Sequence, residues 1–244
     1  MTVLDDIVKR TRARLAERVT VPHSFSLALK KTPAIIAEIK AASPSAGPIV
    51  DNPDVESIAR QYRDGGAAAI SVVTEPEFFR GDTTWLRRAS AASGLPVIMK
   101  DFVVDRRQIA EGVAAGANAM LLLASVLTAA EIGRFIGILN EFGCDALVEV
   151  HDERELERAV EGHARIIGVN NRDLRDFRVD LATSERLVAQ IPAGVIKVAE
   201  SGIRTSDDVQ RLRAAGFGAF LVGESLLRQN DRAAAVRRLI EGDD

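Results

Sequence analysis

Eight short apolar segments recur along the chain at nearly even spacing, and this repeat constrains the fold more than any other feature. The segments read PAIIAEI, AAAISVV, LPVIM, NAMLLL, DALVEV, RIIGV, VIKVAE and GAFLVG. From Ile36 to Ala219, seven intervals cover 183 residues. That is about 26 residues for each interval, the length of one strand–helix unit. The segments are almost continuously apolar, as expected for parallel strands that are covered on both faces.

The connections between these segments carry the signals of helices. One connection places apolar residues at helical spacing before Gly65 and Gly66 stop the helix: Val55, Ile58, Ala59 and Tyr62. Residues 152–155 read as a D-x-x-E helix start. Residues 205–208 resemble a capping box, and Gly216 ends the helix that follows.

Eight strand–helix units predict a single (β/α)₈ barrel over residues 1–244, in the α/β class, with residues 1–33 as an N-terminal helical extension. The alternative is an open, doubly wound sheet. Such a sheet normally carries a glycine-rich phosphate loop after its first strand, whereas SPSAG does not match G-x-G-x-x-G. The barrel is therefore the favoured fold.

Composition excludes several classes of function. The chain has 32 basic and 35 acidic residues in 244, for a formal net charge of −3, and the signs are interspersed. This argues against a nucleic-acid partner. No apolar run approaches the ~20 residues that span a bilayer, and the first residues lack the apolar core of a signal peptide. With one cysteine, Cys144, no internal disulfide can form, so we expect a cytoplasmic protein without a membrane partner.

Polar side chains end five of the eight predicted strands. In a (β/α)₈ barrel, chemistry takes place at the carboxyl ends of the strands. Glu38 and Lys40 lie two residues apart, so they share one face of the first strand. The other strand ends supply Lys100, Asp101, Glu149, Asn170, Arg172, Glu200 and Ser201.

Any one of these charged residues has a structural explanation as a solvated loop residue, or as half of a surface ion pair worth under about 1 kcal/mol. Recurrence on five strands favours an enzyme instead. Two lysines and three glutamates at one mouth would perturb one another's pKa values, as acid–base catalysis requires.

Two further loops predict a phosphate site. Ser201-Gly202 follows the seventh strand, and Gly223, Glu224 and Ser225 follow the eighth. Barrel phosphate sites are often built from these two loops and a helix N-terminus. Turn formation alone would also use glycine and serine, but their presence in both loops favours a phosphorylated small-molecule substrate. The side chain of Glu224 must then point away from the phosphate.

Other candidate chemistries find little support. The three histidines lack ligand-spaced partners, so no metal is expected, and His151 reads as part of a helix start. Cys144 precedes a strand and reads as a small buried residue. Phe79 and Phe102 follow the second and third strands, either as ordinary cover or as a wall for a flat ligand group.

The chain resembles the indole-3-glycerol phosphate synthase family, in which an anilino-deoxyribulose phosphate is cyclised and decarboxylated. The matching motifs, in the order of the family, are IAEIKAASPSAG, ISVVTEPEFFRG, PVIMKDFVVDRRQI, ALVEVHDERELERA, IIGVNNRDL, KVAESGI and FLVGESLLR. They cover the chain from Ile36 to Arg228. The resemblance implies a carboxy-lyase of tryptophan biosynthesis that uses no metal or organic cofactor.

The resemblance also implies roles for individual residues. Lys100 is expected to protonate the ketone oxygen during ring closure, with a pKa lowered by burial. Lys40 is expected to pair with the anthranilate carboxylate, Glu38 to accept a proton or orient the lysines, and Glu149 to assist the dehydration as acid or base. Asn170, Arg172 and Glu200 are expected to hold substrate hydroxyls or the lysine network. The expected phosphate site comprises Ser43, Ser201, Gly202, Gly223, Glu224 and Ser225, and Phe79 and Phe102 are expected to border the anilino ring.

The sequence departs from the family pattern in two places, and two alternative functions remain open. Ala46 stands where many relatives carry Lys or Arg, and the connection over residues 21–34 is short, which puts any lid from that region in question. A phosphoribosyl-anthranilate isomerase would need a Cys and an Asp at strand ends, and Cys144 precedes its strand. A non-catalytic barrel would have lost a mouth lysine, whereas both are present. We expect a monomer, with other tryptophan-pathway enzymes as possible partners.

Overall fold

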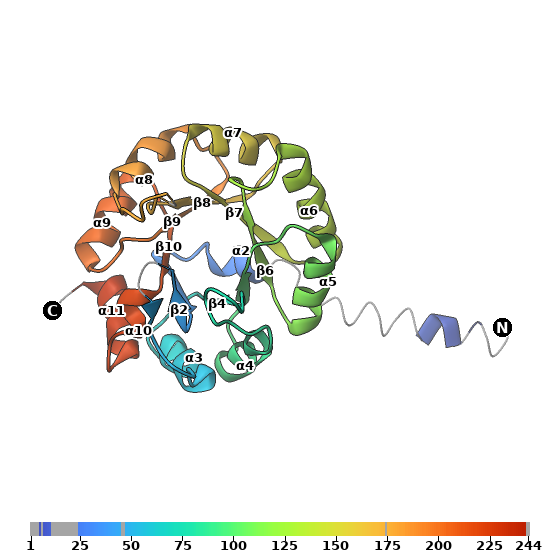
Figure 1. Cartoon of the computed structure of the whole chain (residues 1–244), viewed down its shortest axis with the longest axis horizontal. Helices are drawn as coiled ribbons and strands as arrows, with labels where there is room; N and C mark the ends of the chain where they lie inside the picture. The colour runs from blue at the N-terminus through green and yellow to red at the C-terminus, as the bar shows by residue number, and fades with distance from the viewer. Residues whose placement is uncertain (1–4, 6, 11–23, 45–46, 174, 243–244) are drawn as a thin grey trace.

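Each of the eight apolar segments forms a strand, and the strands close on one another as a parallel barrel (Figure 1). The computed structural model describes residues 5, 7–10, 24–44, 47–173 and 175–242. Around the barrel the order is β1-β10-β9-β8-β7-β6-β5-β4, and β1 pairs with both β4 and β10. The strands are β1 (Ala34–Ile39), β4 (Ala69–Val73), β5 (Val97–Lys100), β6 (Ala119–Leu123), β7 (Asp145–Val150), β8 (Ile166–Asn170), β9 (Ile196–Glu200) and β10 (Ala219–Val222). The predicted barrel is confirmed.

Helices fill the connections and form a ring outside the strands (Figure 1). They are α3 (Val55–Asp64), α4 (Thr84–Ser93), α5 (Arg106–Ala115), α6 (Ala129–Glu141), α7 (Glu153–Glu161), α8 (Ala182–Leu187) with the 3₁₀ turn η1 (Val188–Gln190), α9 (Ser206–Ala215), α10 (Glu224–Leu227) and α11 (Arg232–Glu241). The predicted start signals are confirmed, because Asp152 caps α7 and Thr205 forms a capping box with Asp208 at α9.

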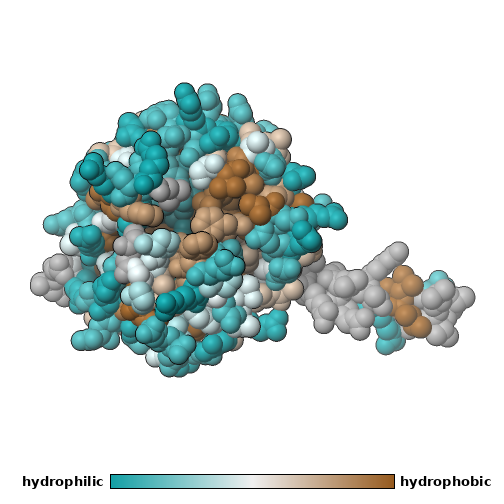
Figure 2. Space-filling model, viewed as in Figure 1, coloured by the Kyte–Doolittle hydropathy of each residue, from teal (hydrophilic) through white to brown (hydrophobic). Residues whose placement is uncertain are grey.

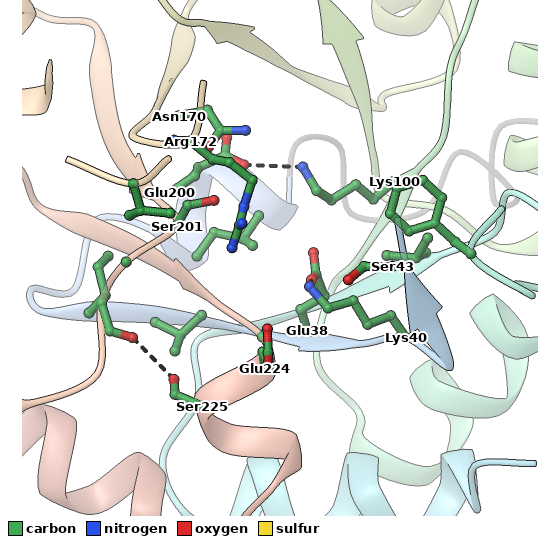
Figure 3. Close-up of a pocket in the computed structure, with 18 of the residues that line it drawn as sticks. Glu38, Lys40, Ser43, Lys100, Asn170, Arg172, Glu200, Ser201, Glu224 and Ser225 are labelled. Atoms are coloured by element: carbon green, nitrogen blue, oxygen red, sulfur yellow. Dashed lines mark hydrogen bonds and ion pairs between the residues drawn. The ribbon is translucent and has the colours of Figure 1, made fainter. Parts of the chain in front are cut away.

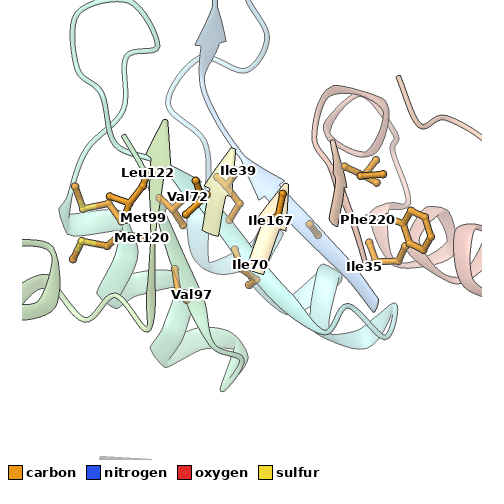
Figure 4. Packing of buried hydrophobic residues seen from close by; sticks show 14 of the residues in the cluster. Ile35, Ile39, Ile70, Val72, Val97, Met99, Met120, Leu122, Ile167 and Phe220 are labelled. Atoms are coloured by element: carbon orange, nitrogen blue, oxygen red, sulfur yellow. The ribbon is translucent and has the colours of Figure 1, made fainter. Parts of the chain in front are cut away.

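Successive side chains of each strand point alternately into and out of the barrel, so the apolar residues form two cores. Outward-facing residues such as Ile35, Val72 and Phe220 pack between the barrel and the helices (Figure 4). Inward-facing residues such as Ile36, Leu147 and Leu221 fill the barrel itself. The same alternation turns Glu38 inward, two residues after Ile36, because successive side chains of a strand point to opposite faces.

The barrel is closed at its amino-terminal end by a short helix, α2 (Ser24–Ala28). Phe25 and Leu29 belong to the inner core, and the backbone N–H of Ser26 donates to Asp145 Oδ2 at the start of β7, 2.8 Å away. Residues 24–29 therefore lie at the opposite end from the carboxyl ends of the strands. Most of the N-terminal helix predicted over residues 1–33 falls on residues 1–4, 6 and 11–23, which lie outside the described part of the chain, as does Ala46.

Two short strands follow β1 at the mouth of the barrel, where β2 (Ala42–Ser43) pairs with β3 (Gly47–Pro48) in antiparallel fashion. On the face seen in Figure 2, polar side chains cover the periphery and apolar side chains gather nearer the centre. In the described segments, no helix is long and apolar enough to cross a membrane.

Candidate active site

The carboxyl ends of the strands surround a cavity of about 810 Å³ at the mouth of the barrel (Figure 3). Strands β1, β5, β7, β8 and β9 each supply at least one polar side chain to it, because these residues continue the inward-facing positions of the strands. Every site residue predicted from the sequence lines this one cavity: Glu38, Lys40, Ser43, Phe79, Lys100, Phe102, Glu149, Asn170, Arg172, Glu200, Ser201, Gly202, Gly223, Glu224 and Ser225.

Lys100 joins two carboxylates from other strands. Its Nζ lies 2.9 Å from Glu149 Oε2 and 3.2 Å from Glu200 Oε2. Asn170 Nδ2 donates to the second oxygen of Glu149 at 3.1 Å. Glu149 and Glu200 are 2% and 1% exposed, so water does not screen this cluster and the charges act strongly on one another.

The two carboxylates of this cluster differ in their affinity for a proton. Burial raises the pKa of Glu200 to about 8, with the neighbouring Glu149 adding to the rise against the opposing effect of Lys100. Burial also disfavours the charged form of Glu149, but Lys100, His151 and Asn170 outweigh it and lower its pKa to about 2. A proton shared by the pair is therefore favoured on Glu200, which has fewer donors around it, over Glu149.

The expectation that burial lowers the pKa of Lys100 is wrong for this structure. Burial does oppose the charged form, but Glu149, Glu200 and Glu38 together outweigh it and raise the pKa of Lys100 above its usual value. Lys100 is therefore an ammonium group throughout the neutral range.

Glu38 and Lys40 form a second ion pair across the mouth from Lys100 (Figure 3). Lys40 Nζ lies 2.7 Å from Glu38 Oε1. Burial disfavours the charged form of Glu38, yet Lys40 and Lys100 hold its pKa below the usual value. The pair needs the open backbone of Gly223, where a Cβ atom would stand 2.5 Å from Glu38 Oε1 and 3.2 Å from Lys40 Nζ.

The loops after β9 and β10 lie side by side at one edge of the cavity. Ser201 and Gly202 have φ angles of 64° and 84°, in the left-handed region that turns the chain sharply at the end of β9. The Ser225 hydroxyl donates to the Ile203 carbonyl at 3.1 Å, which ties the two loops together (Figure 3). Glu224 pairs with Arg228 at 2.9 Å, so its charge is compensated.

Aromatic and guanidinium groups occupy other parts of the cavity wall. The rings of Phe79 and Phe102 lie with centroids 6.2 Å apart and planes at 44°. Arg172 donates from Nη1 to the Phe177 carbonyl at 3.2 Å, and its backbone N–H donates to Asn170 Oδ1 at 3.0 Å.

The sequence did not identify several residues that shape this site. Asn171 is buried and donates to the carbonyls of Glu200 and Ser201, at 3.0 and 3.2 Å, so it holds the end of β9 in place. Its position directly after Asn170, in the segment GVNN, was the only signal. His151 contacts Glu149, although the sequence indicated only a helix start for it. Arg204, Arg228 and Gln229 also line the cavity.

Comparison with known proteins identifies the family. The family model described as indole-3-glycerol phosphate synthase matches residues 5–239. The chain is 45% identical over 232 residues to the indole-3-glycerol phosphate synthase of Rhizorhabdus wittichii, covering 93% of this chain and 88% of the relative. It is 41% identical over 257 residues to that of Rhodopirellula baltica, covering 98% of this chain and 99% of the relative. The chain belongs to the indole-3-glycerol phosphate synthase family.

Solved structures show the same fold outside the indole-3-glycerol phosphate synthase family. The 3-hexulose-6-phosphate synthase of Salmonella typhimurium superimposes with a TM-score of 0.70 at 15% identity, covering 86% of this chain and 97% of that structure. At this identity the likeness concerns the barrel alone.

Cys144 has no place at this site. The thiol lies just before β7, at the amino-terminal end of the strands and away from the cavity, and burial raises its pKa to about 12. It therefore cannot serve as the acid–base cysteine that an isomerase would need. Among the residues that the structure describes, no group of three or more His, Cys, Asp or Glu side chains is arranged to hold a metal ion.

Proposed function

We propose that the chain converts 1-(2-carboxyphenylamino)-1-deoxyribulose 5-phosphate to indole-3-glycerol phosphate, with release of carbon dioxide and water, in tryptophan biosynthesis. Family membership supports the activity. The observation that carries the mechanism is the ion-paired cluster of Lys100 with Glu149 and Glu200 inside the cavity. This cluster places one ammonium, one carboxylate and one protonated carboxyl group within reach of a single bound molecule.

Ring closure is the step assigned to Lys100. The ring carbon that bears the carboxylate attacks the ketone carbon, and the electrons of the C=O bond move to oxygen. That oxygen becomes an alkoxide, which is about as basic as hydroxide, with a conjugate acid near the pKa of water, about 15.7. The Lys100 ammonium can therefore transfer its proton although its own pKa is raised. Glu200 can return a proton to Lys100, because its carboxyl lies 3.2 Å away.

Decarboxylation follows because it restores the aromatic ring. The C–C bond to the carboxylate breaks, and its electrons re-form the ring system as carbon dioxide leaves. Lys40 can bind the carboxylate before the reaction, and its pairing with Glu38 fixes the ammonium at the mouth. The tilted rings of Phe79 and Phe102 form an apolar wall for the anilino ring, where water is excluded and loss of charge is favoured.

Dehydration needs an acid at the leaving hydroxyl and a base for the adjacent C–H proton. The hydroxyl oxygen is the former ketone oxygen, so Lys100 can protonate it a second time after regaining a proton from Glu200. Glu149 is the base in this proposal, since its low pKa keeps it ionised and Asn170 and Lys100 orient its two oxygens. One proton is consumed over the whole reaction, and carbon dioxide and water leave.

The phosphate is assigned to the loops after β9 and β10. The first turn of α10 offers backbone N–H groups without intrahelical acceptors, and the left-handed Gly202 allows close approach of the backbone. The Ser225 hydroxyl already donates to Ile203, so the contribution of Ser225 is its backbone N–H. Ser43 and Arg172 face the same cavity and can bind substrate oxygens. The Glu224–Arg228 pair removes the repulsion that a free carboxylate would impose.

The cellular location, the oligomeric state and the partners of the enzyme are also part of the proposal. A single cysteine, buried with a raised pKa, fits a reducing compartment, and we propose a cytoplasmic monomer. Its partner is the phosphorylated substrate, and other enzymes of the pathway are candidates for contact.

The test is a fluorescence assay of indole formation. The purified chain is incubated with the anilino-deoxyribulose phosphate and, in parallel, with the same compound lacking its phosphate. We expect indole fluorescence with the first substrate and a loss of at least about 100-fold in kcat/KM with the second, because remote binding energy lowers the barrier. No fluorescence from the phosphorylated substrate would refute the proposal.

A further inference from the structure

His151 is a buried, titratable residue that the mechanism above does not use. It follows β7 directly and lies two residues after Glu149. Its Nδ1 lies 2.9 Å from Glu155 Oε2, and its Nε2 lies 3.4 Å from Glu149 Oε1. The imidazole therefore stands between the base proposed for dehydration and a carboxylate of helix α7.

The start of α7 fixes the position of this imidazole. Asp152 caps the helix by accepting from the backbone N–H of Glu155 at 2.9 Å. The Glu155 side chain turns back and accepts from the backbone N–H of His151 at 2.8 Å, as well as from its ring. Backbone and ring of His151 are thus held by one carboxylate, which is itself fixed by the first turn of a helix.

Both ring nitrogens face carboxylates, which favours the doubly protonated ring. Nδ1 hydrogen-bonds Glu155, whereas Nε2 lies 3.4 Å from Glu149 Oε1, at ion-pair distance and without a hydrogen bond within the described residues, so the positive charge of an imidazolium is what would act on Glu149. The titratable groups that face His151 are Glu149 on β7, Glu155 on α7, Glu200 on β9 and Asp173 after β8. Burial opposes the charge, but the hydrogen bond to Glu155 and the attraction of Glu149 outweigh it and raise the pKa of His151.

Glu149 is thereby held from three directions. Lys100 contacts one of its oxygens, while Asn170 and His151 contact the other. His151 does not line the cavity, so it reaches the substrate only through Glu149. A base that is oriented by a third, charged group is a recurrent arrangement in acid–base catalysis.

We infer that His151 is a positioning residue for Glu149: as an imidazolium anchored by Glu155, it orients the Glu149 carboxylate toward the cavity and keeps it ionised for the dehydration step. The inference rests on the role proposed above for Glu149. It predicts that removal of the imidazole lowers turnover without weakening substrate binding.

The kinetic test compares kcat and KM of His151→Gln with those of His163→Asn. His163 is exposed at the far end of α7 with a φ of 61°, which asparagine tolerates, so this control removes a histidine that is remote from the site. For His151→Gln we expect kcat to fall about 10-fold and KM to change less than 2-fold. Values of kcat and KM that match those of the control would overturn the inference.

Nuclear magnetic resonance gives a second test that does not depend on the fold of the His151 variant. The chain has three histidines, and their ¹⁵N imidazole shifts are titrated in the unmodified protein and in Glu149→Gln. We expect the pKa of His151 to be lower in Glu149→Gln. An unchanged pKa would overturn the inference and leave the proposed function standing. Full turnover by Glu149→Gln would instead overturn the proposed role of Glu149, and this inference with it.

Discussion

Replacing Lys100 by methionine removes one positive charge and keeps an unbranched apolar stem. In the structure, this charge lies 2.9 Å from Glu149 and 3.2 Å from Glu200, and the lysine side chain is 19% exposed. With an effective dielectric constant of about 20, the contact with the ionised Glu149 corresponds to about 6 kcal/mol of Coulomb energy. Removing the ammonium leaves the buried Glu149 carboxylate without its main cation, so we expect the free energy of unfolding to fall by about 3–5 kcal/mol.

Lys100→Met is also expected to slow the reaction in the fraction of the protein that remains folded. Loss of a general acid costs roughly 10²–10⁴ in rate, or about 2.7–5.4 kcal/mol of barrier. In addition, the pKa of Glu149 rises from about 2 once the cation is gone, so residual activity should fall further at acid pH.

The assay measures kcat from indole fluorescence between pH 5 and 9. Lys197→Met is the matched control, because Lys197 is a strand lysine of β9 that donates to the Val188 carbonyl and does not line the cavity. We expect the control to retain at least half of the activity. Lys100→Met with more than a tenth of the original kcat would refute the assignment of Lys100 as the acid.

Three further outcomes follow from the structure. Gly223→Ala should lower kcat at least about 10-fold, because the added Cβ would stand 2.5 Å from Glu38 Oε1, whereas Gly137→Ala, with nothing within 4 Å of its Cβ, should leave kcat unchanged. Glu200→Gln should abolish the decline of kcat above about pH 8, because Glu200 holds its proton below that pH and loses it above, whereas glutamine cannot ionise. A decline near pH 8 that remains in Glu200→Gln would contradict this account. Phe25→Ala should lower the free energy of unfolding, measured by urea denaturation, by about 3–5 kcal/mol, because Phe25 is fully buried. KM should stay constant, since Phe25 lies at the end of the barrel away from the mouth. A loss of less than about 1 kcal/mol would contradict its role in closing the barrel.

The strands and their order could be predicted because the sequence repeats one local pattern. Segments such as AAAISVV and DALVEV are too short and too apolar for exposed helices, and the capping residues between them mark where helices begin. Alternation along β1 then places Glu38 on the inner face with Ile36. The short helix α2 was less visible, because Phe25 and Leu29 show only a weak pattern and are ordered by packing into the end of the barrel.

The location of the site residues could also be predicted, but their protonation states could not. The carboxyl ends of parallel strands meet at one mouth, so residues far apart in sequence were expected together. The predicted direction of the Lys100 pKa shift was wrong. Burial lowers this pKa and nearby carboxylates raise it, and the number of carboxylates within about 3 Å of Nζ is known only from the structure. The contact between His151 and Glu149 could not be predicted for the same reason, since it depends on how the Glu155 side chain in the first turn of α7 folds back onto His151.

The most direct test of the proposed division between Lys100 and Glu149 is to time carbon dioxide release against indole formation in a single turnover of Glu149→Gln. Carbon dioxide leaves after ring closure, whereas indole fluorescence develops only after dehydration. If Lys100 is the acid for closure and Glu149 the base for dehydration, carbon dioxide should appear at close to the unmodified rate while indole follows at least about 10-fold more slowly. Carbon dioxide and indole that are slowed together, to the same extent, would contradict the account.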